Sequence, residues 1–536
     1  MPKYIVVTGG VLSGLGKGIT AASIGRLMVN RGFKVAPMKM DPYLNVDCGT
    51  MNPYQHGEVW ITEDGGEIDL DLGHYERFLD AYISKENNVT TGQLYLNVIT
   101  KERKGDYLGE TVQIIPHITD EIKTRIRTVA EKSNADIVII ELGGTVGDIE
   151  GMPYLEALRQ LHAEEGPHNV IFVHVTLVPI LDVVGEFKTK PTQHSVKMLL
   201  ESGIRPTIIV TRSKNEIDQG TKKKIALSCN VSEEGVISSH DVDCVYKIPL
   251  MYEEQNLGNY LAKKMKIWEK KPDFTAWKLF VDQLMTPKNE VTIAIAGKYV
   301  NLMDSYLSIS EAFHHSAAAL HTKINIKWIQ TDDIKNKDDV KNIMKDIDGV
   351  LIPGGFGSRG IEGKVRIIEY ARENNIPFFG ICYGFQLAAV EFARNVMKLE
   401  NAATTEVDPK TNHPVIDMLP EQKNTKELGG TMRLGAYPIV LKNNTVAKKI
   451  YHTDVIYERH RHRYEINPKY IDQFESNGLI FSGMTPDKRR MEILELKDHI
   501  CFIGSQFHPE FKSRPNKAAP LFTYFIESAR KRRGII

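Results

Sequence analysis

Short apolar segments rich in β-branched residues alternate along this chain with longer amphipathic segments. Apolar strands that are separated by helices predict a parallel sheet covered on both faces. In the first half, the predicted helices are Ala21–Asn30 and Thr119–Ser133. The predicted strands there are Tyr4–Thr8, Lys34–Met38, Ile137–Glu141, Val170–Val175 and Thr207–Thr211.

The alternation stops near residue 267, where charged residues surround Pro272. We interpret 267–290 as a linker that separates an N-terminal domain, 1–266, from a C-terminal domain, 291–536. The second domain repeats the α/β pattern, so the whole chain is expected to be α/β. Its predicted strands are Val291–Ala296, Ile324–Ile329, Gly349–Pro353 and Ile376–Ile381.

Composition narrows the function classes. The 536 residues include 68 Lys and Arg against 68 Asp and Glu, so the zero net charge argues against a nucleic-acid partner. The 5 cysteines are scattered without a CxxC pair, which argues against a zinc or disulfide framework. No apolar run approaches the ~18 residues that span a bilayer, and no signal-peptide pattern is visible. We expect no membrane partner and a cytoplasmic location.

A glycine-rich loop, residues 9–20, follows the first strand and opens a helix. Its glycines let backbone N–H groups approach phosphates, and Lys17 can reach the outer ones. The Walker pattern would have a glycine at Val11 and a hydroxyl at Gly18, so this is a variant loop. Thr20 is a candidate replacement for that hydroxyl. We predict a site for a nucleoside triphosphate.

Two acidic elements are candidates for holding Mg²⁺ beside that nucleotide. The apolar strand 137–141 ends in Glu141, in the manner of a Walker B element. The segment 67–71 places carboxylates on alternate residues, and Asp71 is our choice from it. Glu67 and Asp69 fit a solvated face equally well. Mg²⁺ needs only one or two protein carboxylates besides phosphate oxygens.

A second cationic segment, residues 188–197, packs lysines and amides around Pro191. Such a segment suits a polyphosphate or the edge of a nucleobase. By itself the segment is equally consistent with a solvated loop.

The second domain carries a candidate nucleophile, Cys382, between Gly380 and Gly384. Small residues on both sides allow a sharp strand-to-helix turn, and the N-terminus of the predicted helix Phe385–Arg394 favours the thiolate. His508 can accept the thiol proton and Glu510 can orient the imidazole.

Two further patterns fit the same chemistry. The loop 353–357 ends a strand with free N–H groups that suit an oxyanion hole. The basic segment 458–465 suits a small zwitterion, with an arginine for its carboxylate and Glu406 for its amine.

Over almost its whole length the chain resembles the CTP synthase family, and its second half resembles class I glutamine amidotransferases. Several long blocks in one order make chance similarity negligible. The blocks are Ser13–Gly18, Met38–Tyr43, Gly65–Arg77, Gly143–Glu150 and Lys188–Gln193.

The resemblance implies a P-loop, Rossmann-like amidoligase domain followed by a glutaminase domain. It implies that ATP and glutamine drive the conversion of UTP to CTP through a 4-phosphorylated intermediate and channelled ammonia, with Mg²⁺. Implied ATP contacts are Gly14, Leu15, Gly16, Lys17, Gly18, Ile19, Lys39 and Asp71, with Asp71 and Glu141 on the metal. Implied UTP or CTP contacts are Ser13, Asp148, Ile149, Glu150, Lys188, Thr189, Lys190, Pro191, Thr192, Gln193 and Lys224. Implied glutamine contacts are Gly355, Tyr383, Gly384, Phe385, Gln386, Glu406 and Arg463, beside Cys382, His508 and Glu510.

The resemblance further implies activation by GTP, inhibition by CTP, and a homotetramer able to form filaments. For GTP we expect contacts from Phe356, Arg359 and Arg433. The family usually has Leu-Gly-Met after the nucleophile, whereas this chain has Tyr383, Gly384 and Phe385, which we expect to reshape the glutamine pocket. Gly14 stands where serine is common, at a cost of at most one phosphate contact. The alternatives are a P-loop amidotransferase acting on a carboxylate and a regulatory protein whose assembly is driven by nucleotides.

Overall fold

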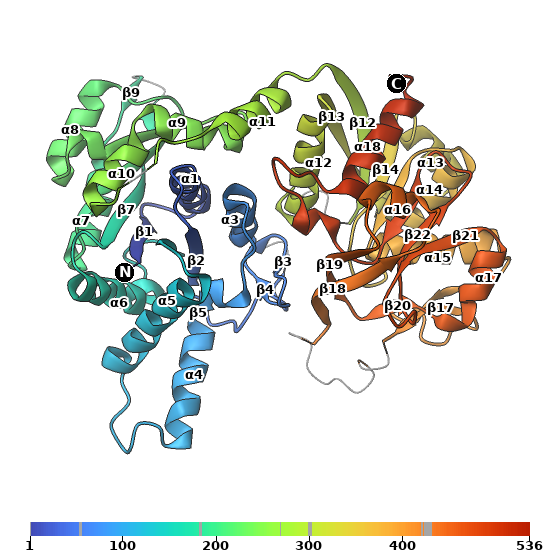
Figure 1. The fold of residues 1–536 in the computed structure, drawn as a ribbon, viewed down its shortest axis with the longest axis horizontal. Helices are drawn as coiled ribbons and strands as arrows, with labels where there is room; N and C mark the ends of the chain where they lie inside the picture. The colour runs from blue at the N-terminus through green and yellow to red at the C-terminus, as the bar shows by residue number, and fades with distance from the viewer. Residues whose placement is uncertain are drawn as a thin grey trace. The chain divides into compact units, whose positions relative to one another are not determined.

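The structure is a computed structural model that describes residues 2–52, 56–181, 185–268, 270–298, 303–419, 422 and 431–535. The chain divides into two compact units (Figure 1). Unit 1 comprises Met1–Cys48 and Asp71–Lys278, and unit 2 comprises Gly49–Leu70 and Leu279–Ile536. Unit 1 is therefore discontinuous in sequence, because the segment 49–70 groups with unit 2.

Unit 1 is built on a seven-stranded parallel sheet in the order β11-β10-β7-β1-β6-β2-β5. The predicted parallel sheet is confirmed, and its expected strands are present with ends shifted by a few residues. The strands are β1 (Lys3–Gly9), β2 (Val35–Asp41), β5 (Asn88–Thr90), β6 (Ile137–Leu142), β7 (Val170–Leu177), β10 (Ile208–Ser213) and β11 (Val236–His240).

Alternate side chains of these strands pack against helices on opposite faces. Tyr4, Val6 and Ile140 share a core with Ile122 of α5 and Leu158 of α6. On the other face, α1 packs so closely that a Cβ on Gly25 would lie 3.2 Å from Ile139. The main helices are α1 (Lys17–Val29), α3 (Asp71–Leu79), α4 (Thr91–Lys104), α5 (Thr119–Ser133), α6 (Met152–Glu165), α7 (Lys190–Glu201), α8 (Gln219–Cys229), α9 (Ile248–Glu254) and α10 (Leu257–Met265).

Because the strands are parallel, their carboxyl ends share one edge of the sheet, where open α/β sheets bind ligands. The phosphate loop follows β1, Glu141 lies near the end of β6, and α7 begins beyond β7. The topology thus gathers the predicted nucleotide residues at this edge.

Unit 2 contains a nine-stranded sheet in the order β13-β12-β14-β15-β23-β22-β21-β18-β19. The first five strands are parallel and the remaining ones extend the sheet in antiparallel fashion. The strands are β12 (Asn289–Gly297), β13 (Thr322–Gln330), β14 (Gly349–Ile352), β15 (Phe378–Ile381), β18 (Arg433–Leu441), β19 (Val455–His462), β21 (Leu479–Met484), β22 (Met491–Leu496) and β23 (Phe502–Ser505).

Helices pack on this sheet, and two apolar cores fill the spaces between them. The helices are α12 (Leu307–Ala319), α13 (Lys337–Ile343), α14 (Ile361–Glu373), α15 (Tyr383–Asn395), α16 (Val446–Tyr451), α17 (Ile471–Ser476) and α18 (Pro520–Arg532). Within the expected linker the chain forms α11 (Thr275–Met285). Among the described residues, no helix combines the length and apolar character needed to cross a membrane.

The segment 49–70 joins unit 2 through ion pairs to strand β19. It forms a short hairpin, β3 (Trp60–Ile61) with β4 (Glu67–Ile68). Arg459 Nε lies 2.8 Å from Oε1 of Glu63, and Arg461 Nε lies 2.8 Å from Oε1 of Glu67. Glu67, which the sequence presented as a possible metal ligand, is therefore neutralised by an arginine within unit 2.

Candidate active sites

Cys382 sits on a strained turn between β15 and α15. It adopts φ 49° and ψ −94°, a conformation that side chains rarely take. A Cβ on Gly380 would lie 2.6 Å from the carbonyl carbon of Gly384, and one on Gly384 would lie 2.2 Å from the Ile352 oxygen. Only glycines fit on either side, so the turn presents the thiol as the sequence predicted.

The base comes from the neighbouring parallel strand. Ile381 of β15 pairs with Ser505 of β23, so His508 follows at the same sheet edge as Cys382. Its Nδ1 lies 2.7 Å from Oε1 of Glu510. Burial by itself would lower the pKa of His508, but the negative charges of Glu510 and of the Cys382 side chain raise it to about 10. The site therefore favours an imidazolium beside the nucleophile.

A glycine loop closes over this pair. A Cβ on Gly354 would lie 2.9 Å from Cε1 of His508 and 3.7 Å from Cβ of Cys382. Gly354, Gly355, Cys382 and His508 line a common cavity of about 260 Å³. Its size suits a small substrate held against the thiol, with loop N–H groups nearby for an oxyanion.

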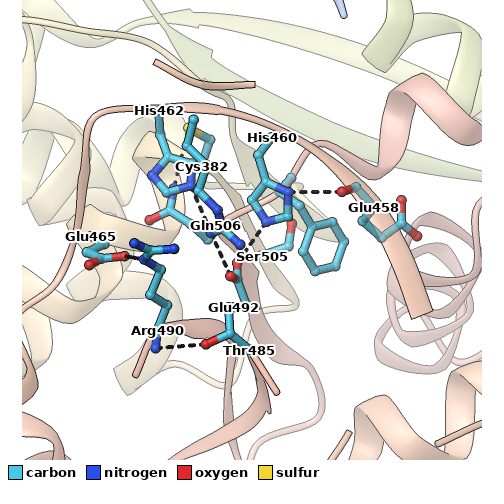
Figure 2. Close-up of polar contacts among 12 residues, drawn as sticks. Cys382, Glu458, His460, His462, Glu465, Thr485, Arg490, Glu492, Ser505 and Gln506 are labelled. Carbon is cyan, nitrogen blue, oxygen red and sulfur yellow. Dashed lines mark hydrogen bonds and ion pairs between the residues drawn. The ribbon is translucent and has the colours of Figure 1, made fainter. Parts of the chain in front are cut away.

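Sequence reasoning missed Gln506, which contacts the nucleophile. Its Nε2 lies 3.6 Å from Sγ of Cys382 (Figure 2). Its Oε1 accepts a hydrogen bond of 3.2 Å from Gln386. The Gln386 bond fixes the amide so that its N–H groups face the sulfur. The Gln-x-His spacing on an extended segment was the signal that could have identified it.

A buried ionic cluster lies behind the nucleophile. Glu492 accepts hydrogen bonds from His460 Nε2 at 2.9 Å and from Arg433 Nη1 at 2.7 Å. Figure 2 shows Glu492 and His460 close to Gln506, and the backbone N–H of Gln506 donates to the Glu492 carbonyl oxygen at 2.8 Å. His460, Arg433 and Glu492 thereby join strands β19, β18 and β22.

The residues expected to bind GTP differ in their exposure. Arg433 is 5% exposed and its guanidinium also stacks on Tyr437, at 4.6 Å from the ring centroid. Arg359 lies on a loop, with its Nε 2.6 Å from Asp332, and Phe356 precedes it. A surface effector would meet Phe356 and Arg359 but not the buried Arg433.

Some of the expected glutamine contacts line the cavity or are partly exposed, and others are buried in the core. Gly355 lines the cavity, and Oε1 of Glu406 accepts a hydrogen bond of 2.6 Å from the N–H of Gly357. Arg463 donates to Gln422 and Thr431, each at 2.7 Å. Gly384 and Phe385 pack in the core, Gln386 holds Gln506 and the Tyr464 carbonyl oxygen, and Tyr383 is buried.

In unit 1 the phosphate loop has the backbone that its glycines predict. Gly14 and Gly16 adopt φ of 76° and 82°, and Gly16 caps the N-terminus of α1. Val11 also adopts a left-handed φ of 79°, which strains a β-branched residue where the Walker pattern has glycine. Lys17 begins α1 and donates to the Gly144 oxygen at 2.7 Å.

Both expected metal ligands face one ammonium group. Lys39 Nζ lies 2.5 Å from Oδ2 of Asp71 and 2.9 Å from Oε1 of Glu141. Burial raises the pKa of Glu141, whereas for Asp71 the effect of burial is outweighed by Lys39 and its pKa falls. A Cβ on Gly18 would lie 2.5 Å from Oδ1 of Asp71, so the carboxylate reaches the phosphate loop only because glycine stands there.

These residues fit Mg²⁺ that is held largely by phosphate oxygens. In the part of the chain that the structure describes, no group of three His, Cys, Asp or Glu side chains forms a protein-only metal cage. Two carboxylates beside a phosphate loop match the small protein share of ligands that Mg²⁺ takes in nucleotide sites.

The expected UTP contacts lie on loops and helices at the same edge. Thr189 and Thr192 are buried, with Thr192 bonded to Thr176 at 3.0 Å, so they support the start of α7. Asp148 accepts a hydrogen bond of 3.0 Å from the Thr145 N–H, and Ile149 is 86% exposed. The remaining expected contacts in loops and helix starts are Ser13, Glu150, Lys188, Lys190, Pro191, Gln193 and, on α8, Lys224.

A buried hydrogen-bond chain that sequence reasoning missed ties α7 to the sheet. His174 of β7 contacts Thr8 of β1 at 2.8 Å and Ser195 of α7 at 2.7 Å. Burial and the charge of Lys17 lower the pKa of His174 to about 3, so it stays neutral. Thr8, His174 and Ser195 thus fix the phosphate loop and the start of α7 on one scaffold.

A cysteine nucleophile with its histidine and glutamate, carried with a phosphate-loop sheet, defines a glutamine-dependent amidotransferase with a nucleotide-binding unit. Residues 3–267 match the family model for the CTP synthase N-terminus, and residues 301–528 match that for class I glutamine amidotransferases. The chain belongs to the CTP synthase family.

Relatives of the chain match it from end to end. It is 58% identical to the CTP synthase of Thermococcus gammatolerans over 99% of both chains and 56% identical to that of Clostridium kluyveri over 98% of both. A solved glutaminase domain of Trypanosoma brucei CTPS with bound acivicin is 34% identical, covers 45% of this chain and 94% of its own, and has a TM-score of 0.43. This protein is thus a glutamine-dependent ligase that converts UTP to CTP in pyrimidine synthesis, with ATP as a substrate and Mg²⁺.

Proposed function

We propose that the two units divide the reaction, with glutamine hydrolysed at Cys382 and UTP activated beside Lys17. The glutaminase corresponds to 291–536 and the synthetase to 1–266, apart from the segment 49–70. The observation that carries this division is the cavity shared by Cys382, His508 and the 354–355 loop, in a unit distinct from the phosphate loop.

In the glutaminase, the Cys382 sulfur attacks the side-chain amide carbon of glutamine. The negative charge that develops on the amide oxygen is stabilised by backbone N–H groups of Gly354 and Gly355, which line the cavity beside Cys382. The His508 imidazolium gives its proton to the leaving nitrogen, and ammonia departs to leave a thioester. The neutral imidazole then takes a proton from water, which hydrolyses the thioester to glutamate and restores the thiol.

In the synthetase, O4 of UTP attacks the γ-phosphorus of ATP, and ADP leaves. Bound Mg²⁺ would be held by Asp71 and Glu141 and would supply neutralisation of phosphate charge. Lys17 and Lys39 orient the phosphates and stabilise charge on the transferred group. Ammonia then attacks C4 of the phosphorylated pyrimidine, and inorganic phosphate leaves with O4 to give CTP.

For the pyrimidine nucleotide we propose the loop residues that open on the sheet edge, chiefly Ser13, Glu150 and Lys188 with its neighbours. Product CTP would compete for the same contacts. A substrate panel separates UTP from a carboxylate acceptor, because only UTP would give the change in absorbance that accompanies CTP formation. An ATP-dependent amidation of carboxylates without CTP would refute the assignment.

We propose that ammonia leaves the Cys382 cavity toward the segment 49–59. Gly49, Thr50, Glu58 and Val59 line that cavity together with the glycine loop. At neutral pH free ammonia becomes ammonium, which does not react, so a sheltered route preserves it.

For GTP we propose the loop 356–359 as the contact, with Arg433 acting from within the protein. The Arg359 guanidinium is half exposed and planar, which suits a phosphate or a guanine edge. An Arg359→Ala variant should lose activation of glutaminase by GTP while keeping its activity without GTP. Activation of this variant at the wild-type GTP concentration would exclude the loop.

We propose that a second copy of the chain covers an apolar surface of unit 1. Ile114, Ile115, Ile149 and Met152 line a depression of about 690 Å³. Leu44 also lines the depression and is 74% exposed. An apolar patch of this kind marks an interface. Leu44→Asp should lower the oligomeric mass measured by light scattering, and an unchanged mass would contradict this interface.

A further inference from the structure

Tyr383, the residue directly after the nucleophile, connects the start of α15 to the glycine loop. Its side chain is 1% exposed, and its hydroxyl donates to the carbonyl oxygen of Gly357 at 2.7 Å. A phenylalanine at this position would have no donor for that carbonyl, so the bond depends on the Tyr383 hydroxyl.

Gly357 is held from its other side by Glu406. The N–H of Gly357 donates to Oε1 of Glu406 at 2.6 Å, and Gly357 adopts a φ of 78° that favours glycine. Tyr383 and Glu406 thus bind the same residue, the first at its carbonyl oxygen and the second at its N–H group. Any shift of Gly357 would change the direction of the Glu406 carboxylate that is bonded to it.

Cations surround this connection. Lys364 is 2% exposed, and its Nζ lies 5.2 Å from the centroid of the Tyr383 ring. Lys298 donates to the carbonyl oxygen of Phe356, one residue before Gly357. Burial raises the pKa of Glu406, whereas the hydrogen bond from the Gly357 N–H and then the charges of Lys298 and Lys364 act to lower it. The bond from Gly357 therefore both favours the carboxylate form of Glu406 and fixes the direction of that carboxylate.

We infer that Tyr383 is a positioning residue that, through Gly357, orients Glu406 toward the α-ammonium group of glutamine. The inference rests on the proposed role of Glu406 as the acceptor for that ammonium. Tyr383 touches neither the thiol nor the reacting amide in this scheme. Its effect is confined to recognition of the amine, so the chemical class it selects is an α-amino acid amide.

The test compares glutamine with 4-carbamoylbutanoate, which is glutamine without its amine. Tyr383→Phe removes only the hydroxyl and keeps the ring beneath Lys364. We expect kcat/KM for glutamine to fall about three- to tenfold, the effect of one hydrogen bond, chiefly through KM. The kcat/KM for 4-carbamoylbutanoate should stay unchanged, as should CTP formation from ammonium salts, which reports an intact fold.

A matched control is Tyr524→Phe, because the Tyr524 hydroxyl also donates to a backbone carbonyl, that of Ile500 at 3.4 Å. This control should leave kcat/KM unchanged for both glutamine and 4-carbamoylbutanoate. Glu406→Gln should reduce the preference for glutamine over its deamino analogue more than Tyr383→Phe does. If Glu406→Gln leaves the preference intact, the assignment of Glu406 fails. The positioning role of Tyr383 is overturned if Glu406→Gln reduces this preference but Tyr383→Phe does not. It is also overturned if Tyr383→Phe lowers kcat/KM equally for glutamine and 4-carbamoylbutanoate.

Discussion

The ammonium of Lys39 lies 2.9 Å from Oε1 of Glu141, a carboxylate that is 1% exposed at the end of an apolar strand. The same ammonium pairs with Asp71, so Lys39 bridges both acids that face the phosphate loop, and Lys17 adds a second positive charge to the group. Removing one partner from a buried pair leaves an uncompensated charge, which costs about 3–5 kcal/mol. Lys39 therefore serves the fold of unit 1 as well as the nucleotide.

Lys39→Met should abolish CTP formation from both glutamine and ammonium salts and lower the unfolding temperature of unit 1. The destabilisation should be larger at pH 8 than at pH 5. Burial already raises the pKa of Glu141, and without Lys39 protonation at low pH is the remaining way to neutralise it. Calorimetry at both pH values measures this, and an equal loss at both would contradict it. Glutamine hydrolysis without nucleotides is the control for unit 2.

Cys382→Ala should eliminate glutamine-dependent CTP formation and leave the ammonium-dependent rate roughly unchanged, because only the glutaminase uses the thiol. Cys501→Ala is the matched control, since Cys501 is equally buried in unit 2 but its sulfur faces the Phe378 carbonyl oxygen. Parallel assays with glutamine and with ammonium chloride measure both routes. Loss of both routes in Cys382→Ala would assign Cys382 to the fold instead.

Glu510→Gln should move the alkaline limb of the glutaminase pH profile to lower pH. In the wild type, Glu510 and the Cys382 side chain outweigh burial and raise the pKa of His508 to about 10, so the imidazolium persists until about that pH. Without the carboxylate, the imidazolium loses its proton earlier. Plots of kcat/KM for glutamine against pH report this group in the free enzyme. A limb that does not move would contradict the role of Glu510, and Glu290→Gln at the surface serves as the control.

Glu492→Gln should lower the unfolding temperature of unit 2. It should also reduce the fall of that temperature as the solution is made acidic. Although burial acts in the opposite direction, His460 and Arg433 hold the pKa of Glu492 far below 4.5. The resulting stabilisation is present above pH 4.5 and is lost as the pH falls below that value. Unfolding temperatures at pH 7 and pH 4 should therefore differ less in the variant. An undiminished difference would show that other groups cause the acid sensitivity.

Local signals in the sequence predicted the parts of the sites that depend on neighbouring residues. Gly380 and Gly384 predicted the strained turn of Cys382, because the steric reason lies within a few positions of the chain. The continuous apolar strands likewise predicted the parallel sheet of unit 1. His508 followed from its spacing to Glu510, and parallel pairing of β15 with β23 places it near the thiol.

Features that depend on distant partners were not predictable. The segment 49–70 joins unit 2 because Glu63 pairs with Arg459, 396 positions away. The burial of Arg433 and its ion pair with Glu492 depend on another strand, β22, which local sequence does not reveal. Thr192 is buried and its hydroxyl bonds to Thr176 of β7, a contact that depends on the packing of α7 on the sheet.

The central claim is that nitrogen released at Cys382 reaches the pyrimidine without mixing with the solvent. An isotope competition tests it directly, with ¹⁵N-amide glutamine and an excess of unlabelled ammonium present during CTP synthesis. The account predicts CTP that carries ¹⁵N almost exclusively at its amino group, as measured by mass spectrometry. CTP whose label is diluted to the isotopic composition of the bulk ammonium would contradict it.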